Sequence, residues 1–430
     1  MFQAITNMVG VEWIAIIIIF FTLVLFLLDR LPLSVTALIS SLLLALFGCM
    51  KFTKVYAGFS TSLVMLVLGM MIVGEALFQT GVVVVLGRKI LKSRFANNER
   101  MMIVILCLIA GSISAFLSNT ATVATFIPLV GSMVAASKGK LTNKNILMPL
   151  GMAASVGGTL TLVGSTAQPM VNSILVQYKY PGIGMFDFAL LAGPCFIALL
   201  LYLGTFGYKI EQKCFKFPDI VEEIDISEMA NFKPNSKTYI AAFTMLFCIF
   251  VFVTEILPMA IVSLLGAAIV IATGCVDFKD CMRRLDWNTV LLMAFAQGIA
   301  AGMNDSGAGK MIAQFTVQHI GENMIVMYIA CIALTVVLTN VMSNTAVAAM
   351  LTPIYIVISA TLGYNPYIFA LGIAIASNLS IATPIGGTAM SQTLVGGYRF
   401  NDYLKLGLPI TVIMTIILMF FGPMLGFAKL

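Results

Sequence analysis

Two copies of the tripeptide Ser-Asn-Thr place neutral polar side chains inside an otherwise apolar chain. The copies occupy residues 118–120 and 343–345, and each is followed at the same distance by a proline, Pro128 or Pro353. Hydroxyl and amide groups both donate and accept hydrogen bonds, so such a cluster can bind anions and cations. A polar group without a partner costs on the order of several kcal/mol in an apolar surrounding, which favours burial in protein or beside a watery cavity. Two matching clusters therefore predict one central binding site.

The amino-acid composition indicates a polytopic membrane protein. Of the 430 residues, 60% are hydrophobic and only 10% are charged, whereas about a quarter of the residues of soluble domains are charged. Apolar runs of roughly 20 residues, long enough to span a bilayer, recur from Trp13 to the carboxyl end. The first run lacks the basic start and the cleavage site of a signal peptide, so we expect a retained helix. The net charge of +6 lies in the links between runs, which favours a topological role over a nucleic-acid partner.

The second half of the chain repeats the first at a nearly constant offset. Matches that keep such a steady register indicate an internal duplication. The two Ser-Asn-Thr copies fall in this register as well. Other matched positions are Pro32 and Pro258, Gly48 and Gly274, Phe52 and Phe278, Gly81 and Gly307, Ser155 and Ser377, and Gly164 and Gly386.

Each half is predicted to hold five transmembrane helices plus one re-entrant hairpin, which makes the chain an all-α polytopic membrane protein. The hairpin is the long apolar segment at 101–137 or 322–362, which can enter the membrane and return with Ser-Asn-Thr at its tip. A single crossing would leave the tripeptide in mid-helix without a partner. An odd number of crossings inverts the second repeat relative to the first. The other predicted helices span 12–28, 31–49, 61–86, 145–178 and 186–208 in the first half, and 238–255, 257–275, 287–305, 366–397 and 404–427 in the second.

Positive charge predicts the orientation independently, because Lys and Arg concentrate in cytoplasmic links. With both termini outside the cell, hairpin one enters from the cytoplasm and hairpin two from outside. The first repeat then spans 1–215, a cytoplasmic linker with an acidic stretch spans 209–237, and the second repeat spans 238–430. Of the 24 Lys and Arg residues, the outer face holds only Lys51, Lys54, Lys179, Lys310 and Lys429.

Two further segments interrupt their predicted helices at matching positions. Residues 155–166 and 377–388 are rich in Gly, Ser and Thr, which loosen or break helices. A helix that starts at membrane depth presents free N–H groups and a partial positive charge, which favour an anion. A helix that ends there presents free carbonyl groups, which suit a small cation. The segments predict a site for an anion and sodium ions without a charged side chain; close packing through small residues is the alternative.

The paired Ser-Asn-Thr signatures, the duplication and the two hairpins resemble the divalent anion:sodium symporter (DASS) family over nearly the whole chain. The resemblance implies a secondary active transporter that carries a di- or tricarboxylate, such as succinate, malate, fumarate or citrate, with Na⁺ across the plasma membrane. It implies an elevator mechanism, in which a transport domain (101–208 and 322–427) moves against scaffold helices (12–86 and 238–305). It also implies a homodimer through the scaffold, surrounded by membrane lipid and without an organic cofactor.

The same resemblance assigns roles to the residues of each signature and of each helix break. Substrate carboxylates would contact Asn119, Thr120, Asn344 and Thr345, with Ser165 and Thr388 beside them. Sodium would bind at Ser114, Ser118, Asn119 and Gly164 in the first half, and at Thr339, Ser343, Asn344 and Gly387 in the second.

One departure from the family pattern leaves the substrate open. The Gly-Thr-Pro-Pro-Asn that often follows the break is replaced by Gly-Ser-Thr-Ala-Gln at 164–168 and by Gly-Thr-Ala-Met-Ser at 387–391. Sodium-independent exchange of dicarboxylates, or transport of sulfate or another oxyanion, are therefore alternatives on the same fold.

Few ionisable residues are predicted at membrane depth. Glu75 in the third helix is expected there, either in ion coupling or as a satisfied polar group. His319, the only histidine, is expected at the surface of the outer link before the second hairpin. A membrane-embedded enzyme needs acids, bases or metal ligands at depth, so we expect no enzyme. A channel is a further alternative, because broken helices also line pores.

Overall fold

The computed structural model describes residues 9–28, 30–82, 85, 98–137, 139–219 and 232–427, and these residues form helices joined by turns, without a β-strand. The predicted all-α fold class is confirmed for this part of the chain. Several predicted features lie outside the described residues. They are the end of the third helix, the basic residues Arg88, Lys89, Lys92, Arg94 and Lys138, most of the acidic linker (220–231), Lys429 and both chain ends (1–8 and 428–430).

The helices of the first half follow the predicted order, and the fourth and fifth predicted segments are each divided in two. A π-helical turn, η5 (Leu203–Gly207), joins α10 to α11. The helices are α2 (Val11–Leu28), α3 (Leu33–Leu46), α4 (Ser62–Gln79), α6 (Glu99–Ser114), α7 (Asn119–Ala136), α8 (Asn143–Gly157), α9 (Ala167–Gln177), α10 (Ala189–Tyr202) and α11 (Tyr208–Cys214).

The second half shows the same divisions and contains two helices that were not predicted, α15 and α17. Its helices are α13 (Ser236–Thr254), α14 (Met259–Ala272), α15 (Phe278–Arg284), α16 (Trp287–Asp305), α17 (Ala308–Ile320), α18 (Met324–Thr339), α19 (Asn344–Thr361), α20 (Tyr367–Ala376), α21 (Thr388–Gln392) and α22 (Phe400–Met424).

Corresponding helices begin and end at the same kinds of residue. Pro32 and Pro258 stand at the N-caps of α3 and α14, where a proline suits the first turn because its missing N–H is not needed. Gly48 and Gly274 follow the two helices with φ of +76° and +65°, a backbone region that favours glycine. Both helices consequently have 14 residues. They are shorter than predicted because the prediction included these turns.

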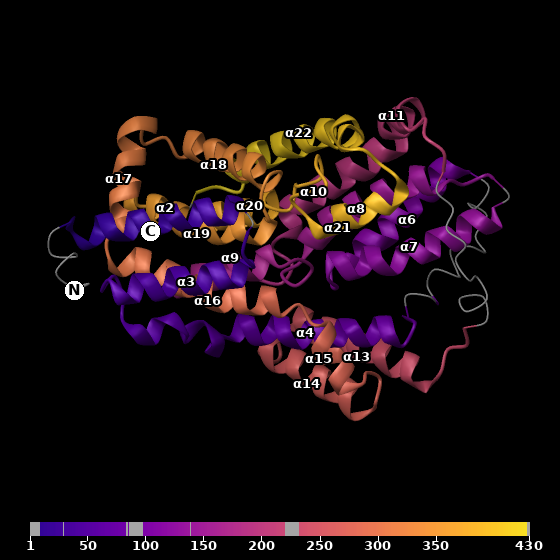
Figure 1. Cartoon of the computed structure of the whole chain (residues 1–430), viewed down its shortest axis with the longest axis horizontal. Coiled ribbons are helices and arrows are strands. Elements are labelled where there is room, and N and C mark those ends of the chain that lie inside the picture. The colour runs from indigo at the N-terminus through magenta and orange to yellow at the C-terminus, as the bar shows by residue number, and fades with distance from the viewer. Residues whose placement is uncertain are drawn as a thin grey trace.

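The two halves are interleaved rather than separate. Helix α3 of the first half packs against α16 of the second, and α4 of the first packs against α14 of the second. In Figure 1 these helices lie in the lower half of the molecule, while α8, α10, α21 and α22 lie at the upper right. Helix α10 packs along its counterpart α22. An exchange of matching partners is what an internal duplication predicts.

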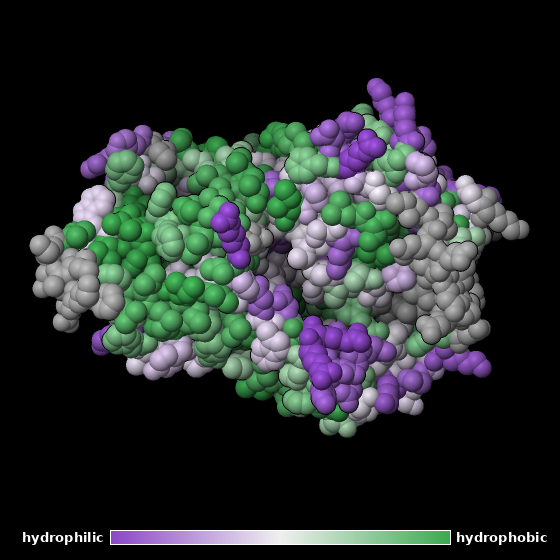
Figure 2. Space-filling view, in the orientation of Figure 1, coloured by the Kyte–Doolittle hydropathy of each residue, from purple (hydrophilic) through white to green (hydrophobic). Residues whose placement is uncertain are grey.

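The outer faces of several helices are apolar. Phe20, Phe243 and Phe250 are 65%, 71% and 62% exposed, and Figure 2 shows apolar residues in green over much of the left part of the visible face. Soluble proteins rarely expose apolar patches of this extent, whereas membrane-spanning helices require them. Six described helices are long and apolar enough to cross a membrane, namely Val11–Leu28, Ser62–Gln79, Ala189–Cys214, Ser236–Thr254, Asn344–Thr361 and Phe400–Met424.

Helix α17 replaces part of the predicted outer link. Gly307 precedes it with φ of +81° and Gly321 ends it with φ of +95°, so both boundaries use a glycine. The helix has 13 residues, too few to register as a membrane span, and it packs against α19. His319 lies exposed in its last turn and shares a hydrogen bond of 2.8 Å with the carbonyl oxygen of Phe315. The surface position predicted for this histidine agrees with the structure.

Glu75 has partners at the end of α4. The amide of Gln79 donates a hydrogen bond of 2.8 Å to its carboxylate, and an Arg284 guanidinium nitrogen lies 3.6 Å away. The arginine belongs to α15, the unpredicted short helix of the link before α16. Of the two roles considered for Glu75, the structure therefore favours a satisfied polar group.

Candidate functional site

The tripeptide Ser-Asn-Thr starts a helix in both halves. Helix α6 ends at Ser114 and α7 begins at Asn119, while α18 ends at Thr339 and α19 begins at Asn344. The first N–H groups of a helix have no partner within it, so each tripeptide presents donors to groups outside its helix. One of them, the Asn344 N–H, donates a hydrogen bond of 3.3 Å to the Gly386 carbonyl oxygen. The helix breaks thus lie where the sequence predicts the hairpin tips.

Two threonine pairs join the tips to the other half of the chain. The hydroxyl of Thr345 lies 2.5 Å from that of Thr166, which precedes α9. The hydroxyl of Thr120 is hydrogen-bonded to that of Thr388, which begins α21. Each tip therefore meets the broken helix of the opposite half, and helix starts from both halves converge on one polar cluster.

This convergence provides an electrostatic environment for an anion. The N-terminus of a helix carries roughly half a positive charge and free N–H groups. Helices α7, α9 and α19 have 18, 11 and 18 residues and all begin at the cluster. The hydroxyl groups of the threonine pairs add neutral donors. Among the described residues, the hydroxyl groups of these threonines are hydrogen-bonded to one another, so the cluster gains its positive character without Lys or Arg.

A first group of oxygen atoms surrounds the side-chain amide of Asn119. The Ser114 hydroxyl, from the end of α6, lies 2.7 Å from one terminal atom of that amide. The carbonyl oxygens of Gly164 and Ala154 lie 3.0 Å and 3.1 Å from the same atom. The oxygens of Ser114 and Ala154 come from the last turns of α6 and α8, and that of Gly164 comes from the break after α8. Helix ends and unwound backbone are the usual sources of sodium ligands in transporters.

A second group repeats this arrangement around Asn344. The Thr339 hydroxyl lies 2.9 Å from one terminal atom of the Asn344 amide. The carbonyl oxygens of Gly386 and Ser377 lie 2.9 Å and 3.0 Å from the same atom, and the Ser380 hydroxyl lies 2.7 Å from it. A rotation by half a turn exchanges the oxygen and nitrogen of an amide. With its nitrogen inward, Asn344 donates to these oxygens; with its oxygen inward, it completes a cage of oxygens for a cation.

Two glycines are required for this close packing. A Cβ at Gly158 would lie 2.0 Å from the Asn119 side-chain oxygen, and a Cβ at Gly386 would lie 1.9 Å from the Thr339 carbonyl oxygen. Neither approach is possible for another residue without a shift of the backbone or of the asparagine. The glycines in the predicted breaks therefore serve contact with the hairpin tips.

The structure brings most of the predicted site residues together, with three differences. The hydroxyl groups of Ser118 and Ser343 form no hydrogen bond with the other predicted ligands within the described part of the chain. The carbonyl group that faces Asn344 belongs to Gly386 rather than to the predicted Gly387. The Ser165 hydroxyl, predicted beside the substrate, donates a hydrogen bond of 2.7 Å to the side-chain oxygen of Asn378.

Three side chains at the site, those of Thr166, Asn378 and Ser380, were not among the predicted ligands. The repeat register places Thr166 opposite Thr388, which was predicted, so the duplication already contained a signal for Thr166. Asn378 lies within the predicted break at 377–388, but its repeat counterpart is Val156, so symmetry gives no signal for it.

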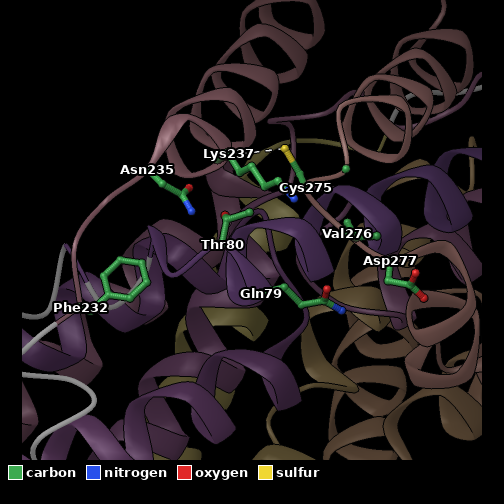
Figure 3. A pocket seen from close by; sticks show the side chains of 9 residues that line it. Gln79, Thr80, Phe232, Asn235, Lys237, Cys275, Val276 and Asp277 are labelled. Carbon is green, nitrogen blue, oxygen red and sulfur yellow. Dashed lines mark hydrogen bonds between the residues drawn. The ribbon is translucent and has the colours of Figure 1, made fainter.

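A cavity of 480 Å³ lies away from this cluster, between the end of α4, the start of α13 and the turn after α14. Figure 3 shows its labelled lining residues, including Thr80, Lys237 and Asp277, and the contact of the Cys275 thiol with the Lys237 carbonyl oxygen, 3.5 Å long. None of the predicted site residues lines it. The convergence of helix starts, not this cavity, is the candidate site.

The family of the chain follows from comparison with known proteins. A family model described as citrate transporter (CitMHS) matches residues 23–374 and 249–429. The chain belongs to this citrate transporter family. An uncharacterized transporter of Haemophilus influenzae is 28% identical over 428 residues, covering 94% of this chain and 90% of that protein. The sodium-dependent dicarboxylate transporter SdcS of Staphylococcus aureus is 22% identical over 391 residues, covering 83% and 75%.

Solved structures with the same fold are also transporters. The YdaH transporter of Alcanivorax borkumensis superposes with a TM-score of 0.63 at 13% identity and covers 97% of both chains. MtrF of Neisseria gonorrhoeae gives a TM-score of 0.59 at 15% identity, covering 86% of this chain and 82% of that one. At these identities the likeness establishes the fold alone. Together with the relatives, the family confirms the predicted resemblance to sodium-dependent dicarboxylate transporters and identifies a multi-pass membrane transporter.

Proposed function

We propose that this member of the citrate transporter family is a sodium-coupled symporter of a di- or tricarboxylate in the cell membrane. The observation that carries the proposal is the double arrangement at each Ser-Asn-Thr, with oxygen atoms at helix ends beside Asn119 or Asn344 and helix starts at Thr120 or Thr345. The oxygen atoms at the helix ends suit sodium, and the helix starts suit a carboxylate. The relatives named as sodium-dependent dicarboxylate transporters support the choice of ligands.

Coupling follows from the short distance between the two kinds of site. Asn119 and Thr120 are neighbours in sequence, as are Asn344 and Thr345, so an ion at the asparagine fixes the helix start that faces the anion. Sodium also offsets the negative charge that an anion brings to the cluster. Each ligand then binds better when the other is present, and this mutual effect is the thermodynamic basis of symport.

The architecture we propose for transport is that of two inverted repeats in an elevator. Helices within 101–208 and 322–427 would form the moving domain, and those within 12–86 and 238–305 the scaffold of a homodimer in the lipid bilayer. The equal lengths of α3 and α14 and the exchange of partners between halves support the duplication. The charge distribution supports extracytoplasmic termini.

A thermal-shift screen tests the ligand classes directly. Purified protein is heated with succinate, malate, fumarate, citrate or sulfate, in sodium and in potassium buffer. We expect a carboxylate to raise the melting temperature in sodium buffer and to have little effect in potassium buffer, because ligands stabilise the state they bind. Stabilisation by sulfate alone, or equal stabilisation in both buffers, would contradict the proposal.

The altered sequence after each break favours a second candidate, sodium-independent exchange of dicarboxylates or transport of another oxyanion. Residues 164–168 and 387–391 lack the two prolines and the asparagine that often follow the break in the DASS family. Counterflow distinguishes the candidates. Proteoliposomes loaded with unlabelled anion and kept without sodium accumulate labelled anion only if the protein is an exchanger.

A further inference from the structure

Asn378 connects the two halves of the candidate site. It follows α20 and is 1% exposed. Its side-chain oxygen accepts a hydrogen bond of 2.7 Å from the Ser165 hydroxyl, which comes from the break of the first half. The same oxygen lies 3.4 Å from the side-chain nitrogen of Asn344 in the second signature. One buried amide therefore touches a residue of each half.

The orientation of the Asn378 amide is fixed by its own partners. Its nitrogen donates a hydrogen bond of 3.0 Å to the carbonyl oxygen of Ala374, one turn earlier. Its oxygen must then face Ser165, whose hydroxyl can donate to it. A half-turn of this amide would place its nitrogen against a hydroxyl and its oxygen against a carbonyl oxygen, with loss of the hydrogen bond to Ala374.

This fixed oxygen distinguishes the two orientations of Asn344. When the Asn344 oxygen points toward Gly386 and Ser377, its nitrogen points toward the Asn378 oxygen, an acceptor. When the Asn344 amide is reversed, its nitrogen donates to the surrounding oxygens and its oxygen accepts from the Ser380 hydroxyl at 3.2 Å, but the contact with Asn378 becomes one between two oxygens. A cation among these oxygens excludes the inward-facing nitrogen. In that ion-bound orientation Asn378 supplies the acceptor for the Asn344 nitrogen.

No matching amide orients Asn119 among the described residues of the first half. The counterpart of Asn378 in the repeat is Val156, which is fully buried and has no hydrogen-bonding side chain. The oxygen groups around Asn119 and Asn344 have similar signature residues. They differ because, in the described part of the chain, only Asn344 has a buried amide, that of Asn378, beside it. The difference predicts unequal behaviour of the two sodium positions.

We propose that Asn378 is a positioning residue for the second sodium position. It holds the Asn344 amide oxygen toward the ion and, through Ser165, ties that position to the anion cluster. The inference rests on the proposed sodium-coupled function and deepens it. Asn378 touches neither ion nor anion in this account, so its loss changes the response to sodium before it changes the response to substrate.

The test replaces Asn378 by Val, the residue at the repeat counterpart, position 156. It measures how sodium activates anion uptake in proteoliposomes. Loss of the acceptor is expected to raise the half-saturating sodium concentration about tenfold and to lower the Hill coefficient for sodium toward one. The anion concentration for half-maximal uptake at saturating sodium is expected to stay within about threefold of wild type. Asn378→Asp keeps an acceptor toward Asn344 and is expected to retain the cooperative response to sodium.

A second measurement covers the case in which Asn378→Val does not fold. Asn378→Ser is smaller and polar, and its hydroxyl is too short to reach Asn344, so the same weakened response is expected. Sodium-induced stabilisation without any anion, followed by thermal unfolding, gives a readout that does not depend on transport. A normal sodium response in any folded Val or Ser variant overturns the inference alone. Absence of a sodium response in the wild-type protein overturns the proposed function itself.

Discussion

The hydroxyl oxygens of Thr166 and Thr345 lie 2.5 Å apart, although the two residues belong to opposite halves of the chain. In the repeat, Thr388 corresponds to Thr166 and Thr120 corresponds to Thr345. The hydroxyl groups of these two counterparts are also hydrogen-bonded to each other. Each hairpin tip is thus closed by the broken helix of the other repeat. Both contacts join residues of the two halves, so the proposed site requires both.

The threonine pairs are expected to contribute to anion binding. Thr345→Val keeps the shape of the side chain and removes the hydroxyl, so we expect the KM for the anion to rise about tenfold with a smaller change in kcat. Thr166→Val is expected to have a similar effect, and the double variant to be little worse than either, because the two hydroxyls act as a unit. Initial rates of uptake measure this. Additive losses in the double variant, or a normal KM in both single variants, would argue against a shared role of the two hydroxyls. The control is Thr254→Val, at the exposed end of α13.

The asparagines at the centres of the oxygen groups are expected to be indispensable. Asn119→Ala and Asn344→Ala remove the amide that each group surrounds, so we expect uptake to be abolished while the protein remains in the membrane. Uptake assays and quantification of the protein in membranes check this together. Asn401→Ala, at an exposed position in α22, is the matched control and should transport normally. Wild-type transport by both site variants would refute the central site.

The close approach of Gly386 to Thr339 predicts a steric effect. A methyl group at this position would lie 1.9 Å from the Thr339 carbonyl oxygen, so Gly386→Ala must displace the break from the hairpin tip. Such overpacking costs about 1–3 kcal/mol, which should lower the melting temperature and the apparent affinity for sodium. Gly193→Ala in α10 has nothing within 4 Å of the added methyl group and is the control. Equal melting temperatures and sodium responses for the two variants would show that the tight contact is unimportant.

Glu75 is expected to be dispensable for coupling. Its carboxylate is paired with Gln79 and Arg284, and the arginine side chain is 65% exposed, so the pair contributes only about 0–1 kcal/mol to stability. Glu75→Gln should therefore retain sodium-dependent uptake with a small change in melting temperature. Measuring uptake as a function of sodium concentration decides the matter. Loss of sodium dependence in a folded Glu75→Gln protein would show that Glu75 takes part in sodium coupling.

The local part of the site was predictable from sequence because its signals are local. Ser-Asn-Thr predicted the helix breaks at Asn119 and Asn344. The resemblance to the DASS family assigned Ser114 and Thr339 to the same sites, and both contact the asparagines. The resemblance pointed to Gly387, whereas the carbonyl oxygen that faces Asn344 belongs to the preceding Gly386, because a motif match does not fix a helix boundary to a single residue.

The remaining parts depend on contacts between distant segments. The role of Asn378 arises from Ser165 and Asn344, which come from different halves, and its own repeat counterpart is apolar. Helix α17 was missed because a 13-residue helix bounded by glycines does not resemble a membrane span. The short helix α15, which supplies the partner of Glu75, was missed because its 7 residues are mostly charged and too few to span a membrane.

Sodium-coupled symport is tested directly by uptake of radiolabelled succinate and citrate into proteoliposomes, with and without an inward sodium gradient. We expect an inward sodium gradient to drive accumulation of at least one of these anions above its outside concentration. Replacing sodium by potassium should abolish this accumulation. Uptake of the transported anion at the same rate and to the same level in sodium and in potassium would show that transport is not coupled to sodium.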